Sequence, residues 1–165
     1  MKWITRAKAV TDKVLNSAVI LIFAGMTGLI IVLVMLRYFF NTSIPGGNEA
    51  LRFAFVYTTF LGAAILVGQQ QHIAIHLVTK HLPRTAQRIF AALQNWIIIA
   101  MHVYLLTLSF RWIAVTGGNM AEELKFPLRF IQIALPIGTI LASLYAFANS
   151  IEALFDREWR KEIPE

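Results

Sequence analysis

Four stretches without a charged side chain constrain this chain more than any other feature of its sequence. They cover residues 14–36, 53–71, 89–110 and 130–151. A helix of about 22 residues is roughly 33 Å long, enough to cross a hydrocarbon core of about 30 Å. Because lipid offers the backbone no hydrogen-bond partner, such segments must be helical. The sequence therefore predicts an all-α polytopic membrane protein with four transmembrane helices.

The second span is expected to run on to residue 75, because no fixed charge follows before Lys80. The four spans are therefore placed at 14–36, 53–75, 89–110 and 130–151. We expect one domain over residues 1–165. Its composition of 58% hydrophobic and 15% charged residues is more apolar than that of a typical soluble domain.

The residues before the first span are basic but carry an apolar stripe. Trp3, Ala7, Val10 and Val14 share one helical face. This pattern favours a short interfacial helix over residues 2–13, with a frayed basic terminus as the alternative.

The basic residues predict which way the chain faces. Four spans place both termini on one side, together with the loop between the second and third spans. That side would carry ten of the fifteen lysines and arginines, and the other side five. By the positive-inside rule, both termini are expected in the cytoplasm.

Several function classes are excluded by what the sequence lacks. The chain has no cysteine, which removes disulfides, iron–sulfur clusters and thiolate zinc sites. No phosphate-binding glycine loop or catalytic triad is present, so no enzyme activity is predicted. The net charge of +6 comes from residues that flank spans, which argues against a nucleic-acid partner. No acid lies within a span, so we expect that the chain does not move a charged solute by itself.

Glu49 and Arg52 lie where the second helix is expected to begin. Gly46, Gly47 and Asn48 are typical of a turn followed by an N-cap, which places Glu49 in the first turn. Arg52 is three residues further on the same face. These two residues either cap the helix and pair at the surface, or orient the helix and bind a partner. Arg37 is a third candidate for this cluster.

Small residues and one proline predict how the helices pack. Pairs such as Thr58 and Gly62, four residues apart, allow close approach of helix backbones, within the chain or to another subunit. Pro136 lies inside the fourth span and is expected to free a carbonyl and kink the helix. Thr139 or Ser143 could satisfy that carbonyl.

The histidines leave a haem-binding alternative open. His72 and His76 are four apart and share a helix face, with His81 nearby. His72 would lie roughly 28 Å from the outer face, near the cytoplasm, whereas His102 would lie roughly 20 Å from the inner face. This mismatch argues against haem between His72 and His102. No cofactor or metal is predicted, and a haem b electron-transfer anchor is the second hypothesis.

Three segments together resemble a known family. They are NEALRFAFVYTTFLGAA at the second span, QQQHIAIHLVTKHLP after it, and KFPLRFIQIALPIG before the last. They are similar to the small, Q-type (DctQ-like) membrane subunit of tripartite ATP-independent periplasmic (TRAP) transporters. The resemblance covers roughly residues 14–150.

The resemblance transfers the family's characteristic positions to seven residues: Glu49, Arg52, Gly62, His72, Pro83, Pro136 and Gly138. The chain departs from the family at Asn48, where a second acid is frequent, and at His76, where an aspartate is frequent. Subunit contact or helix orientation is the role expected for Arg37, Glu49, Arg52, Gly62, His72, Pro136 and Gly138.

The resemblance implies an accessory role in a bacterial inner membrane. A large sodium-coupled subunit would carry the solute, and a periplasmic binding protein would deliver an organic acid such as a dicarboxylate or a sialic acid. The small subunit would be a scaffold in the lipid bilayer. Charged residues of the outer loops are further contact candidates: Glu122, Glu123, Lys125 and Arg129.

Overall fold

The computed structural model describes residues 2–69 and 84–155, which form an all-α arrangement. Its long helices are α1 (Lys2–Phe39), α2 (Gly47–Gly68), α4 (Arg84–Thr116) and α6 (Ala134–Phe155), and the short α5 (Arg129–Gln132) precedes α6. Each long helix contains a segment long and apolar enough to cross a membrane. The four predicted spans are therefore present as helices.

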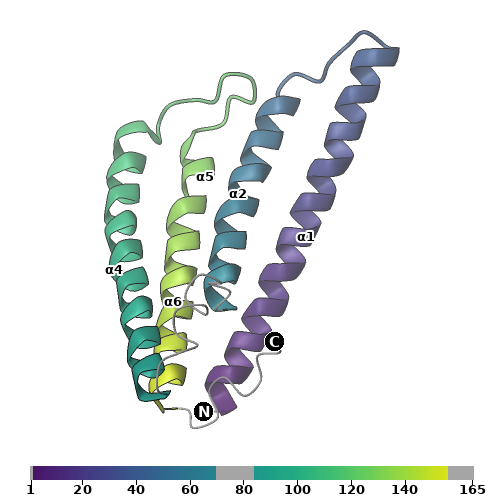
Figure 1. Cartoon of the computed structure of the whole chain (residues 1–165). Helices are drawn as coiled ribbons and strands as arrows, with labels where there is room; N and C mark the ends of the chain where they lie inside the picture. The colour runs from purple at the N-terminus through teal and green to yellow at the C-terminus, as the bar shows by residue number, and fades with distance from the viewer. Residues whose placement is uncertain (1, 70–83, 156–165) are drawn as a thin grey trace.

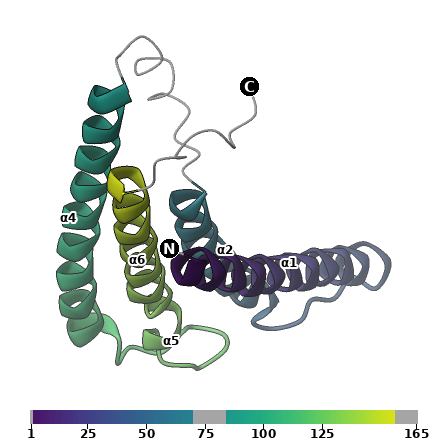
Figure 2. The ribbon, with the colours of Figure 1, turned by 90° about the horizontal axis from the view of Figure 1, so that it is seen from below.

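α6 is the central helix of the arrangement (Figure 1). It packs between α4 and α2, and α1 packs on the other side of α2. Seen from below, α1 leads away from α4 and α6 (Figure 2). None of the most apolar part of α1 is buried inside the chain, whereas 44% of the corresponding part of α5 and α6 is. Most of the surface of α1 is therefore free for lipid or another subunit.

The core lies where α2 and α6 meet the first half of α1. Its buried members are aliphatic residues around one tyrosine: Leu15, Ala64, Ile65, Val67, Ala142, Tyr145 and Ala146. Tyr145 fits there because Gly68 has no side chain, and a Cβ on Gly68 would lie 2.8 Å from the tyrosine ring. We call the end of the molecule near Lys2 and Phe155 the terminal end. The opposite end, which carries connections 40–46 and 117–128, is the loop end.

The structure corrects the predicted N-terminal helix. α1 is continuous from Lys2, with no separate interfacial helix over residues 2–13. No glycine or proline precedes Gly25, so nothing interrupts the hydrogen-bond ladder. The helix ends where Asn41 adopts a left-handed conformation (φ 53°) and the Thr42 N–H reaches the Leu36 carbonyl at 3.1 Å.

The predicted bounds of the second span are also corrected. α2 begins at Gly47 rather than at residue 53, and its N-cap is Gly46 rather than Asn48. It ends at Gly68, where the Gln69 N–H bonds back to the Ile65 carbonyl at 2.9 Å. Residues 70–75 of the predicted span lie outside the described residues. The charge-free rule started the span too late because Glu49 and Arg52 belong to its first turns.

The third span is longer than predicted, and the fourth is divided into two helices. α4 is longer than residues 89–110 at both ends. The fourth span is interrupted at Ile133, and Pro136 lies in the first turn of α6 rather than in mid-helix. Pro136 has no N–H to give the carbonyl of Gln132, which explains the interruption there. Thr139 donates instead to the Leu135 and Pro136 carbonyls, both at 3.0 Å, and Ser143 to Thr139 at 2.8 Å.

Candidate functional site

Glu49 fastens the start of α2 to the 117–128 connection of the loop end. Its side chain is buried at the start of α2, with a relative exposure of 7%. The carboxylate accepts three backbone N–H groups of the 117–128 connection, from Glu122 at 3.1 Å, Glu123 at 3.0 Å and Leu124 at 2.8 Å. Hydrogen bonds to an ionised group are the stronger kind, and all of these join segments far apart in sequence. Glu49 is therefore a structural clamp, which the sequence did not distinguish from a surface cap.

A second contact returns from the 117–128 connection to the start of α2. The Glu123 carboxylate accepts the backbone N–H of Gly46 at 2.7 Å. Gly46 has φ 81°, and a Cβ there would lie 2.6 Å from the Leu124 side chain. Only glycine fits this position, because it needs both a left-handed backbone and the missing side chain. The two contacts give the loop end a fixed shape.

Arg52 lies on the solvent-exposed side of Glu49. Its guanidinium lies 3.3 Å from the Glu49 carboxylate, so the predicted pair is present. The two partners differ in environment, since the Arg52 side chain is 64% exposed and that of Glu49 is 6% exposed. Arg52 and the exposed Glu122 border a shallow polar hollow, which Asn48, Glu49 and Glu123 also line. A partner protein can contact the charged side chains of Arg52 and Glu122 here without breaking the hydrogen bonds of Glu49.

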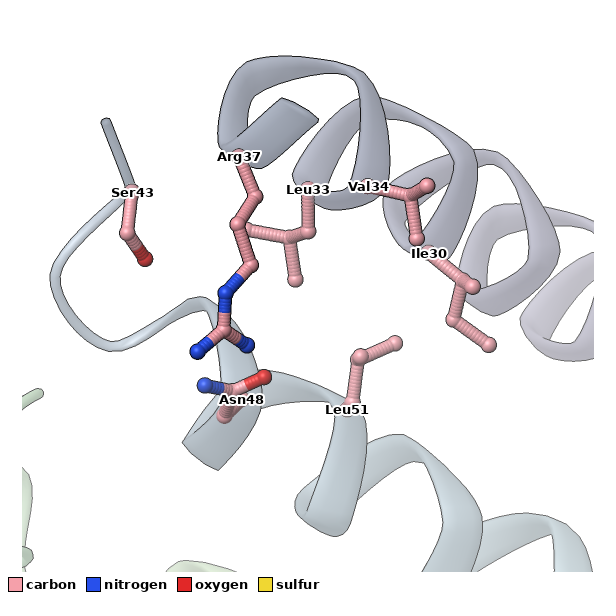
Figure 3. A pocket seen from close by; sticks show the side chains of 7 residues that line it. All are labelled: Ile30, Leu33, Val34, Arg37, Ser43, Asn48 and Leu51. Carbon is pink, nitrogen blue, oxygen red and sulfur yellow. The ribbon is translucent and has the colours of Figure 1, made fainter. Parts of the chain in front are cut away.

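The remaining charged candidates of the loop end do not line the hollow. Lys125 occupies a turn with φ 57°, and Arg129 is the first residue of α5. Both are exposed. The structure does not bring Arg37 into the Glu49 cluster, because Arg37 lines a different pocket between α1 and α2 (Figure 3).

Gly138 and Gly62 have different surroundings, although the same role was expected for both. A Cβ on Gly138 would lie 2.8 Å from Phe60 Cβ and 2.9 Å from the Phe60 carbonyl oxygen, so the α6 and α2 backbones cross closely here. A Cβ on Gly62 would meet nothing within 4 Å. Gly138 therefore packs inside the chain, and Gly62 leaves its face open.

The histidine candidates are described only in part. His72, His76 and His81, together with Pro83, lie outside the described residues. His102 lies in the middle of α4, and its Nδ1 is 2.8 Å from the carbonyl of Ile98 in the same helix. Among residues 2–69 and 84–155, no three His, Cys, Asp or Glu side chains gather as a metal site would require.

A polar cluster at the terminal end was missed by the sequence analysis. Asn149 is fully buried in α6 and donates to the Val67 carbonyl of α2 at 2.8 Å. It also accepts a hydrogen bond from Lys8 at 2.6 Å, and Lys8 pairs with Glu152 at 3.1 Å. The Tyr145 hydroxyl donates to the Asp12 carboxylate. This cluster joins α1, α2 and α6.

A weak signal for this cluster was present in the sequence. Lys8 and Asp12 are four apart, and Tyr145, Asn149 and Glu152 are spaced by four and three, so each set shares one helix face. Nothing in the sequence paired the two faces, because the partners lie at opposite ends of the chain.

Replacing Asn149 by alanine is expected to destabilise the chain by about 2 kcal/mol, because the Val67 carbonyl and Lys8 each lose a buried partner. Thermal unfolding of the purified chain in detergent, followed by circular dichroism, measures this. Asn95→Ala is the matched control, since the hydrogen bond that the Asn95 amide makes among the described residues is to Ala91 in its own helix. An equal loss in both variants would contradict a bridging role for Asn149.

Comparison with known proteins identifies the family. The family profile described as the DctQ component of tripartite ATP-independent periplasmic transporters matches residues 26–156. The chain belongs to the DctQ family. Two Haemophilus influenzae proteins with the provisional name TRAP transporter small permease protein are similar to this DctQ chain. One is 26% identical over 144 residues, covering 87% of this chain and 89% of the relative. The other is 22% identical over 129 residues, 78% of each.

Family membership confirms the resemblance seen in the sequence. This DctQ-family chain is a small permease component of a TRAP transporter, a multi-pass membrane protein that serves transport and is not an enzyme. The match includes the whole loop-end clamp and Gly138, whereas Lys8 and Asp12 of the terminal-end cluster precede it. The transport role replaces the haem-anchor hypothesis.

Proposed function

We propose that this chain is the scaffold subunit of its transporter. In this role it holds a large sodium-coupled membrane subunit in the bilayer and offers its loop end to a periplasmic binding protein. The observation that carries the proposal is the contrast at the loop end. The buried Glu49 holds the 117–128 connection on the start of α2, and Arg52 and Glu122 remain exposed beside it.

The distribution of charge supports a scaffold role for this chain and a transporting role for its partner. The described apolar parts of the helices contain no acid, and the carboxylates that are present lie near the ends of the helices. Coupled transport of a charged solute commonly needs buried ionisable groups within the membrane. A chain without them suits support of a transporting partner.

The orientation of the chain follows from its basic residues. Ten of the fifteen lysines and arginines belong to the terminal side, which therefore faces the cytoplasm in this proposal. The loop end then faces the periplasm of a bacterial inner membrane, where a soluble binding protein can reach it. The proposed cargo class is an organic acid such as a dicarboxylate or a sialic acid, with specificity residing in the partners.

Reconstitution into liposomes with a sodium gradient tests the proposal. The chain, the large permease subunit and the binding protein are combined, and uptake is measured with radiolabelled dicarboxylates and sialic acid. We expect uptake with all three components and none with this chain alone. Uptake by this chain alone, or undiminished uptake when only this chain is left out, would refute the scaffold role.

A further inference from the structure

A second pocket lies at the loop end, between the last turns of α1 and the start of α2 (Figure 3). It has a volume of about 130 Å³. Its polar part is formed by Arg37, Ser43 and Asn48. Its apolar part continues along the two helices through Ile30, Leu33, Val34 and Leu51. One end of the pocket is therefore suited to a charged group and the other to a hydrocarbon.

Arg37 supplies a positive charge that no described acid neutralises. Figure 3 shows its side chain extending from α1 toward Asn48 at the start of α2. Among residues 2–69 and 84–155, the ion pairs are Lys8 with Glu152 and Arg52 with Glu49. The carboxylates of Glu49 and Glu123 are taken up by backbone N–H groups. The pocket is thus complementary to an anion.

The surroundings of Arg37 place this charge at the edge of the membrane. The next three residues are aromatic and largely exposed, with relative exposures of 81% for Tyr38, 75% for Phe39 and 72% for Phe40. Exposed aromatic side chains at the end of a membrane-spanning helix are typical of the headgroup region. An anion at this depth, with hydrocarbon beneath it, is the chemistry of a phospholipid.

The packing of the two helices fixes the wall of the pocket. Leu33 of α1 lies against Gly47, where a Cβ would be 2.6 Å from its side chain. This close approach holds α1 on the first turn of α2 and sets Arg37 opposite Asn48.

We propose that this pocket binds an anionic phospholipid, with the phosphate on Arg37, Ser43 and Asn48 and one acyl chain along Ile30, Val34 and Leu51. The volume fits a phosphate group and the beginning of a chain, and the rest of the lipid stays in the bilayer. The inference requires only that the chain lies in a membrane. It does not depend on which subunits the chain assembles with.

Electron paramagnetic resonance of spin-labelled lipids tests the site on the full-length chain in phosphatidylcholine nanodiscs. We expect labelled phosphatidylglycerol to be immobilised more than labelled phosphatidylcholine. Arg37→Gln should lower this preference about fivefold, the effect expected of one basic residue at an anionic headgroup. Arg111→Gln is the matched control, since Arg111 is an exposed arginine of α4 that does not line the pocket. Inorganic phosphate is added in a parallel arm and should not displace the labelled lipid.

Three outcomes would overturn the inference. An unchanged preference in Arg37→Gln would remove the site, and an equal loss in Arg111→Gln would reduce it to general charge attraction. Displacement by inorganic phosphate would show a soluble anion site instead. Within the first outcome, loss of co-purification of Arg37→Gln with the large permease subunit would show that the pocket receives a carboxylate of that protein and not a lipid.

A second measurement covers the case in which the Arg37 variant does not fold. The chain has no cysteine, so Thr42→Cys, at an exposed residue beside the pocket that does not line it, gives a single site for an environment-sensitive fluorophore. With Arg37 unchanged, short-chain phosphatidylglycerol should change its fluorescence at lower concentration than short-chain phosphatidylcholine. Equal responses to the two lipids would contradict the proposal.

Discussion

Replacing Glu49 by glutamine is expected to release the 117–128 connection from the start of α2. The glutamine side chain keeps the size of the carboxylate but loses its charge, and its NH₂ group faces N–H donors that need an acceptor. Hydrogen exchange of the purified chain, followed by mass spectrometry, measures the result. The amides of Glu123 and Leu124 should exchange at least about tenfold faster than in the wild type.

Arg52→Gln is the matched control for the clamp, because Arg52 touches the same carboxylate from the solvent side. Exchange in the 117–128 connection should stay close to the wild-type rate in this variant, since an exposed ion pair contributes little. Equal exchange in Glu49→Gln and the wild type would contradict the clamp.

The two variants also distinguish two ways in which the loop end could serve assembly: through its shape, which Glu49 maintains, and through direct contact with the charge of Arg52. Glu49→Gln should weaken co-purification with partner subunits through a loosened loop end, and Arg52→Gln through a lost surface charge. Both should leave membrane insertion intact. Unchanged co-purification and transport in both variants would show that this surface is not used for assembly.

Gly138→Ala is expected to destabilise the crossing of α6 and α2 by about 2 kcal/mol. The added Cβ would lie 2.9 Å from the Phe60 carbonyl oxygen, and backbone cannot move aside as the end of a side chain can. The expected result is a lower midpoint of thermal unfolding for the purified chain in detergent.

Gly62→Ala is the control for Gly138, since it introduces the same methyl group on α2 where nothing lies within 4 Å. Its unfolding midpoint should equal or exceed that of the wild type, because alanine favours the helix over glycine. A Gly138 variant as stable as the Gly62 variant would show that the crossing can relax. Loss of partner binding in a stable Gly62→Ala chain would assign that open face to another subunit.

The helices could be predicted from the sequence because lipid imposes a simple rule on charge. Long charge-free stretches located all four. Their ends were less predictable, since they depend on contacts between distant segments. The charge-free rule excluded Glu49 and Arg52 from the second span, yet the helix includes them because the 117–128 connection satisfies the carboxylate of Glu49.

The candidate site was predictable in its residues and not in its arrangement. Glu49 and Arg52 were recognised, and their pairing followed from helical spacing. That Glu49 is buried and Arg52 exposed depends on the 117–128 connection, which no local pattern places. Gly62 and Gly138 differ for the same reason, because Phe60 faces only one of them.

The contacts of Glu49 and of Lys8 both join residues far apart in the sequence, and this separation affects the order in which the fold can form. Glu49 meets N–H groups more than 70 residues later, and Lys8 meets partners more than 140 residues later. A chain is synthesised from its N-terminus, so Glu49 and Lys8 are made before these partners. The contacts of Glu49 cannot form until the 117–128 connection has been made, and those of Lys8 cannot form until α6 has been made. A chain cut short before α6 therefore leaves Lys8 and the Val67 carbonyl without the Asn149 side chain that both contact in the complete fold.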